Sequence, residues 1–158
     1  MLFDIGHFLF HNRENGGFSL SGLNGPHPQN IGAKRKGSLL ARITRISSGG
    51  EFEKKVGYCR AVVAGGFIHV AGTVGQGDDV VSQCSSALEI IGKALAEAGA
   101  GFADVVRVNY YLPDAAEFEP CWAMLAEAFG ENPPAATMIE CGLIDPKYRI
   151  EIEVTALA

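Results

Sequence analysis

The stretch YCRAVVAGGFIHVAGT, residues 58–73, consists of two apolar runs separated by Gly65 and Gly66. Two consecutive glycines suit a tight hairpin turn, because each can adopt a positive φ without steric penalty. The stretch therefore predicts one strand from about Tyr58 to Ala64 and a returning strand over residues 67–73.

A helical pattern follows this hairpin. Asp78 and Asp79 precede it, where acidic side chains suit the positive end of the helix dipole. Apolar residues then recur at spacings of three and four until Gly99, which is typical of an amphipathic helix with one buried face. The residues of this stripe are Val80, Cys84, Ala87, Leu88, Ile91, Ala94, Leu95 and Ala98.

The remaining pattern predicts strands over residues 41–46, 103–112, 136–143 and 148–157. A second helix, with Pro120 in its first turn, is expected before Gly130. The order β-β-β-α-β-α-β-β indicates an α+β domain, a mixed six-stranded sheet with two helices on one face. Nothing else in the predicted domain can cover the other sheet face, so a second copy of the chain is expected to cover it.

The length of 158 residues suits a single domain. Residues 1–40 are rich in Gly, Asn, Ser and Pro and show no period, so we expect a flexible N-terminal arm before a domain at 41–158. The opening MLFDIGHFLF is apolar but contains Asp4 and lacks a basic region, which argues against a signal peptide.

Charge and cysteine usage exclude several classes of function. The net charge is −5, and residues 1–40 carry four basic and two acidic side chains, which leaves −7 on the rest of the chain. An acidic domain is a poor partner for nucleic acid, and no run of 18 apolar residues predicts a membrane span. The four cysteines form no CxxC pair, so we expect reduced thiols in a cytoplasmic protein, with no metal and no cofactor.

Four short segments carry a family resemblance. GYCRAV at 57–62 resembles P-Y-S-Q-A-V, IHVAG at 68–72 resembles I-x-x-S-G, PAAT at 134–137 stands at a P-A-R-S position, and IEIE at 150–153 matches a closing I-E-I-E. In this order and at these intervals the segments resemble the Rid family, RidA/YjgF, often described as endoribonuclease L-PSP.

The resemblance implies a chorismate-mutase-like fold, a homotrimer and a small-metabolite pocket at each subunit interface. Members of the family hydrolyse reactive enamines and imines and release ammonia, with a glutamate that helps place the attacking water. Carried over to this chain, the glutamate is Glu151. The positions that would bind substrate are Tyr58, Arg60, Gly72, Ala136, Thr137 and Met138.

One departure from the family pattern concerns the substrate clamp. The family's arginine grips the substrate carboxylate, and Ala136 stands at that position here. The chain thus resembles an arginine-lacking subgroup, and standard 2-imino acid deaminase activity is not expected. We expect either a hydrolase acting on C=N bonds with altered specificity or a non-catalytic metabolite-binding protein. The family's historical description suggests a third function, RNA cleavage, against which the acidic charge argues.

Alternation along strands leaves two interpretations for several residues. Arg60 shares a strand face with Tyr58 and can supply the cation that position 136 lacks, or it is a surface arginine; Arg107 is the rival cation. Glu151 and Glu153 alternate with apolar neighbours, which fits either a pocket or the polar face of a final strand. His69 fits a structural histidine.

Overall fold

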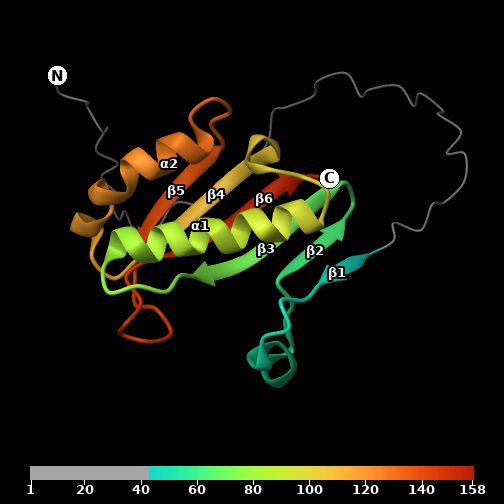
Figure 1. Ribbon diagram of the computed structural model, residues 1–158, viewed down its shortest axis with the longest axis horizontal. Coiled ribbons are helices and arrows are strands. Elements are labelled where there is room, and N and C mark those ends of the chain that lie inside the picture. Colours follow the sequence, from blue (N-terminus) through green and yellow to red (C-terminus); the bar gives the residue numbers. More distant parts are fainter. Residues whose placement is uncertain (1–42) are drawn as a thin grey trace, which may run out of the picture. The chain divides into compact units, whose positions relative to one another are not determined.

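The computed structural model describes residues 43–158, which form one mixed six-stranded sheet with strand order β1-β2-β3-β6-β4-β5 (Figure 1). Strands β4 and β5 pair in parallel, and all other neighbours are antiparallel. The predicted α+β fold with a mixed six-stranded sheet is confirmed. The strands are β1 (Thr44–Ile46), β2 (Ala61–Ala64), β3 (Phe67–Val74), β4 (Val105–Leu112), β5 (Ala135–Glu140) and β6 (Glu151–Leu157).

The hairpin that opens the fold is where the sequence places it. Gly65 and Gly66 form the turn with φ values of 61° and 86°. Strand β2 starts three residues later than predicted, because a π-helical turn, η1 (Glu53–Gly57), leads directly into Tyr58. The expected strand over 41–46 is seen over Thr44–Ile46, whereas positions 41 and 42 and the expected arm at 1–40 lie outside the described residues.

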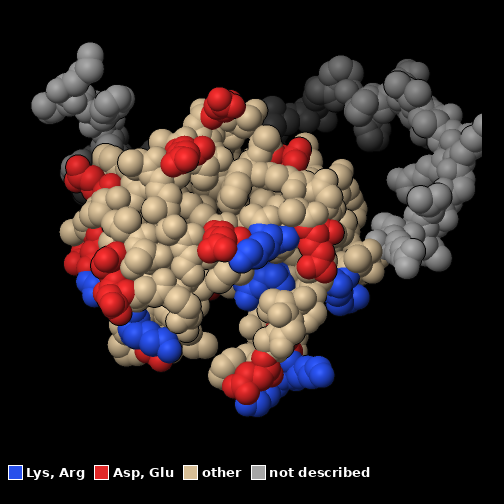
Figure 2. Space-filling view, viewed as in Figure 1, with Lys and Arg blue, Asp and Glu red and all other residues tan. Residues whose placement is uncertain are grey.

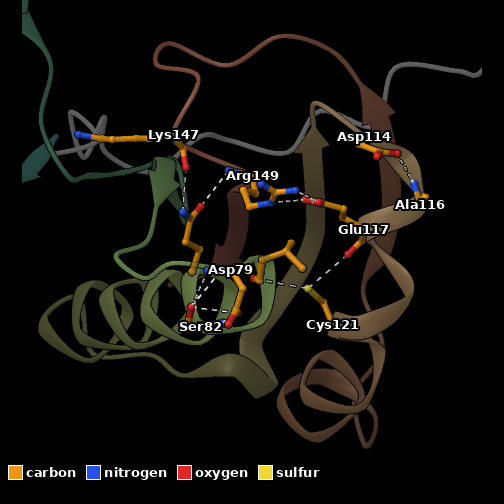
Figure 3. Close-up of polar contacts among 10 residues, drawn as sticks. Asp79, Ser82, Asp114, Ala116, Glu117, Cys121, Lys147 and Arg149 are labelled. Carbon is orange, nitrogen blue, oxygen red and sulfur yellow. Dashed lines mark hydrogen bonds and ion pairs between the residues drawn. The ribbon is translucent and has the colours of Figure 1, made fainter.

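Helix α1 (Val80–Glu97) packs its predicted apolar stripe against the sheet. Asp79 caps its N-terminus, where the carboxylate accepts a hydrogen bond of 2.8 Å from the Ser82 backbone N–H (Figure 3). Seven of the eight predicted stripe residues are buried, and the eighth, Ala98, is partly buried against the same core.

The second helix, α2 (Trp122–Phe129), is shorter than the pattern predicts. Pro120 lies in a separate 3-10 turn, η4 (Glu119–Cys121), and not in the first turn of α2. Two further 3-10 turns, η2 (Phe102–Asp104) and η3 (Ala115–Glu117), flank β4. Both helices lie on the same side of the sheet in Figure 1, as expected.

The opposite sheet face is not covered by any of residues 43–158. Burial alternates along β6, where Ile152 and Val154 are fully or nearly fully buried on the helix side. On the other side, Phe67 and its partner Leu157 are 41% and 50% exposed. We call this side, which carries Phe67, His69, Glu153 and Leu157, the open face.

Candidate functional site

Gly72 of β3 leaves space for the side chain of Glu151 on β6. A Cβ atom at this position would lie 1.9 Å from Oε1 of Glu151, which is much closer than atoms can approach without movement. The Glu151 carboxylate therefore rests directly against the Gly72 backbone. Sequence analysis assigned Gly72 to close contact with a ligand, and in this structure the close neighbour is the carboxylate of the predicted catalytic residue.

The pKa of the half-buried Glu151 is raised. Burial is the main cause, and the negative charge of Glu153 adds to it, while the Arg60 guanidinium acts in the opposite direction. A carboxyl group with a raised pKa holds a proton closer to neutral pH than an ordinary glutamate does. Such a group is suited to accept and return a proton during hydrolysis.

Glu153, two residues along the same face, is held by two neutral donors. Its Oε1 accepts hydrogen bonds from Asn109 Nδ2 at 2.6 Å and from the Tyr111 hydroxyl at 3.0 Å. Strand pairing sets this arrangement, because Glu153 lies opposite Asn109, and Glu151 lies opposite Tyr111. Burial, together with the hydrogen bond to Glu153, raises the pKa of Tyr111, so its hydroxyl remains a donor.

The start of β6 is fixed by hydrogen bonds from helix α1. Buried Gln83 accepts from the Arg149 backbone N–H at 2.8 Å and donates to the Lys147 carbonyl at 2.9 Å. The Arg149 guanidinium also pairs with Glu117 of η3 (Figure 3). These contacts fix the backbone two residues before Glu151.

Arg60 is already bound by the protein. Its Nη1 donates to Thr73 Oγ1 at 2.7 Å and to the Gly72 carbonyl at 3.4 Å, and its Nε is shielded from solvent without a partner. Hydrogen bonds from Ser47 and Ser48 are the main causes that lower the pKa of Glu53, and the charge of Arg60 adds a smaller effect in the same direction. At Glu151 the charge of Arg60 only partly opposes the rise in pKa caused by burial and by Glu153. The guanidinium is thus anchored by the neutral oxygens of Thr73 and Gly72 and forms no ion pair with any of residues 43–158.

A cavity of about 510 Å³ lies on the open face. Its lining includes Arg45, Tyr58, Cys59, Val62, His69 and Glu153, but not Arg60. A smaller hollow of about 150 Å³ adjoins it and shares His69, Val70 and Glu153 with it. We call the two together the open-face groove, and a space of this size accepts a small metabolite.

Strand β5 divides the remaining predicted residues between two faces. Thr137 pairs with Asn109 and shares the open face with Glu153. Ala136 and Met138 instead pair with Val108 and Tyr110, which are buried on the helix side. A single chain therefore does not bring Ala136 and Met138 together with Tyr58 and Glu151.

Other ligand types find little support in the described part of the chain. No group of three His, Cys, Asp or Glu side chains within residues 43–158 is placed to hold a metal ion. The helices of this part are also too short or too polar to cross a membrane. All four cysteines are free thiols, of which Cys84 and Cys121 are buried and Cys59 and Cys141 half-buried.

The sequence pattern did not identify Arg45 as a site residue. It left Glu153 between a pocket and a polar strand face, and it indicated a structural histidine at His69. The signal for Arg45 was present, because its strand alternates polar and apolar residues. What the alternation did not give was the strand order, which places Arg45 beside the hairpin.

A mixed sheet with both helices on one face and a groove of mixed polar and apolar lining on the other defines an α+β protein with a small-molecule-sized site. Residues 50–158 match the family described as endoribonuclease L-PSP, and the chain belongs to this family, the Rid/YjgF family of the resemblance above.

Relatives and solved structures agree with this assignment. A RutC family protein of Pyrococcus abyssi is 35% identical over 107 residues, which is 63% of this chain and 84% of that protein. The crystal structure of Rv2704 from Mycobacterium tuberculosis, a member of the YjgF/YER057c/UK114 family, is 44% identical with a TM-score of 0.72, over 74% of this chain and 100% of that one. NMB1025 of Neisseria meningitidis, a YjgF protein, is 28% identical with a TM-score of 0.66, over 74% and 95% of the two chains.

Proposed function

We propose that this protein hydrolyses the C=N bond of a small imine or enamine, with Glu151 as the group that activates water. The observation that carries the proposal is the pair of carboxylates in different environments, with the pKa of Glu151 raised and Glu153 held by Asn109 and Tyr111. Two nearby carboxylates with different surroundings are suited to divide proton transfer and charge stabilisation between them.

Ammonia release tests this function directly. Imines generated in situ from amines and amino acids by a coupled amine oxidase are followed with and without the protein. Acceleration of hydrolysis by the wild-type chain supports the proposal. If no imine of the panel is hydrolysed faster while small metabolites still bind, the chain is the non-catalytic binding protein, an alternative favoured by the alanine at position 136.

RNA is not the substrate that these features support. Outside residues 1–40 the chain carries a net charge of −7, and the helix-bearing face shows acidic and basic side chains interspersed, with no single basic patch (Figure 2). A binding surface for a phosphate backbone needs a concentration of positive charge.

For 2-iminobutanoate we expect little or no acceleration of hydrolysis. Ala136 offers no guanidinium for the carboxylate, and loss of a desolvated charge pair of this kind typically weakens binding by about 2–5 kcal/mol. The substrate is generated with threonine dehydratase, and ammonia and 2-oxobutanoate are followed. Robust turnover would show that another cation has replaced the family's arginine.

We also propose that the protein is a homotrimer in which each open face packs on neighbouring copies. The exposed apolar pair Phe67 and Leu157 supports this, as does the position of Ala136 and Met138 on the far side of the sheet from Glu151. A pocket that uses both sets of residues requires two chains. Light scattering coupled to gel filtration should give three times the chain mass, and a stable monomer at micromolar concentration would contradict the assembly.

A further inference from the structure

Arg45 is a free cation at one end of the open-face groove. It is the middle residue of β1 and lies opposite Val62, which in turn lies opposite His69 of β3 and, through it, Thr155 of β6. These four side chains form one row across the sheet. Arg45 lines the larger cavity, is exposed, and makes no hydrogen bond or ion pair with any residue in the range 43–158.

Glu153 is a partly free anion nearer the middle of the same groove. It lines both hollows, and only its Oε1 is hydrogen-bonded, to Asn109 and Tyr111. Its second carboxylate oxygen, Oε2, has no partner among the described residues and remains able to accept a hydrogen bond. Arg107 lines the smaller hollow together with Glu153, lies opposite Thr155 in the same cross-strand row, and is exposed without a hydrogen bond or ion pair to any of residues 43–158. The groove therefore offers one unpaired acceptor and two cations without a partner among the described residues, Arg45 at its far end and Arg107 in the same hollow as Glu153.

The charges of Arg45 and Glu153 are well separated across the sheet. Arg45 lies on β1 and Glu153 on β6, which is three strands away in the order β1-β2-β3-β6. With neighbouring strands 4.7–4.9 Å apart, their backbones are separated by roughly 14 Å. The side chains of Arg45 and Glu153 can extend towards each other along the groove and shorten this distance. A ligand that contacts both groups must still carry its positive and negative charges several bonds apart. The apolar residues Val62 of β2 and Val70 and Ala71 of β3 also line the larger hollow, which contains both Arg45 and Glu153.

We propose that the groove binds an ω-amino carboxylate, a molecule whose carboxylate and protonated nitrogen are separated by several methylene groups. Arg45 pairs with the carboxylate through two N–H donors, and Glu153 Oε2 accepts from the nitrogen. This inference rests on the proposed function and names its class of ligand: the groove is lined by Glu153, two residues along β6 from the water-activating Glu151, although Glu151 itself is not in its lining. A ligand with both charges on or next to one carbon cannot span the two groups.

Calorimetric titration with a spacing series tests the inference. The probes are glycine, β-alanine, 4-aminobutanoate and 6-aminohexanoate, with hexylamine and hexanoate as singly charged controls of the same length as the longest. Affinity should rise with spacing, and 6-aminohexanoate should bind about tenfold or more tightly than either control, as expected for an added charge-assisted hydrogen bond. Equal affinity along the series, or tighter binding of glycine, would overturn it.

Two variants assign the ends of the ligand. Arg45→Gln should weaken 6-aminohexanoate by about tenfold and leave hexylamine unchanged, whereas Glu153→Gln should leave hexanoate unchanged. Lys93→Gln, on the exposed side of α1 in a surface ion pair with Glu89, is the matched control and should change neither. Loss of binding in Arg107→Gln or in Arg60→Gln, with no change in Arg45→Gln, would assign the carboxylate to that arginine and overturn the inference.

The proposed function has its own readout. Imine hydrolysis that depends on Glu151, together with no spacing dependence, would overturn the ω-amino carboxylate while the hydrolase stands. Spacing-dependent binding without ammonia release would support the ligand class and identify the chain as a binding protein.

Discussion

Replacement of Gly75 by alanine should destabilise the domain by about 3 kcal/mol or more. Gly75 is buried where the chain passes from β3 towards α1, and a Cβ atom there would lie 1.9 Å from the Gln83 carbonyl oxygen and 2.7 Å from the Ala87 backbone nitrogen. Both are backbone atoms of α1 that cannot rotate away, so the helix itself must shift. Chemical denaturation, followed by circular dichroism, measures the loss.

Gly142→Ala is the matched control for this substitution. Gly142 follows β5, and a Cβ atom there meets nothing within 4 Å. The same added methyl group should therefore leave the free energy of unfolding almost unchanged. Similar stabilities of the two variants would show that β3 and α1 are not held as closely as the structure indicates.

Glu151→Gln should reduce imine hydrolysis by about 10²-fold or more, a typical contribution of a positioned general acid or base. The amide keeps the shape of the carboxyl group and its place over Gly72 but cannot take a proton from water. Glu127→Gln, the same chemical change on the exposed side of α2, should retain full activity. Equal loss in both variants, or none in Glu151→Gln, would remove Glu151 from the mechanism.

Glu151→Gln, which should lose activity, should gain stability relative to wild type at neutral pH. Because the folded-state pKa of Glu151 is raised, the native protein binds this proton more tightly than the unfolded chain, and the carboxyl makes the fold less stable as pH rises through that range. Glu151→Gln removes this dependence. Relative to wild type, the variant should be more stable at neutral pH than at acidic pH, and thermal unfolding at both pH values measures the difference.

The hairpin and helix α1 could be predicted from the sequence because their signals are local. Two glycines set the turn, and a stripe of apolar residues with an acidic cap sets the helix. The turn η1 could not be predicted, since it depends on the carboxylate of Glu53 reaching back to Ser47 and Ser48. In the sequence, Ser47, Ser48, Gly49 and Gly50 indicate only the end of the preceding strand.

The candidate site could be predicted only in part for a related reason. Alternation along a strand gives pairs of residues on one face, as it did for Glu151 and Glu153, but not which strands are neighbours. Strand order is what places Arg45 in the groove with Glu153 and assigns Thr137 and Ala136 to opposite faces. These are long-range properties that no short window of sequence contains.

The central place of β6 has a consequence for assembly of the sheet. The last strand of the chain pairs with β3 on one edge and β4 on the other, so it joins two halves that have no strand pairing with each other. Until β6 inserts, the β1–β3 half and the β4–β5 half each have an unpaired edge, and such edges are prone to aggregation. Insertion of this one strand protects both edges at once, which makes it the step that commits the domain to its fold.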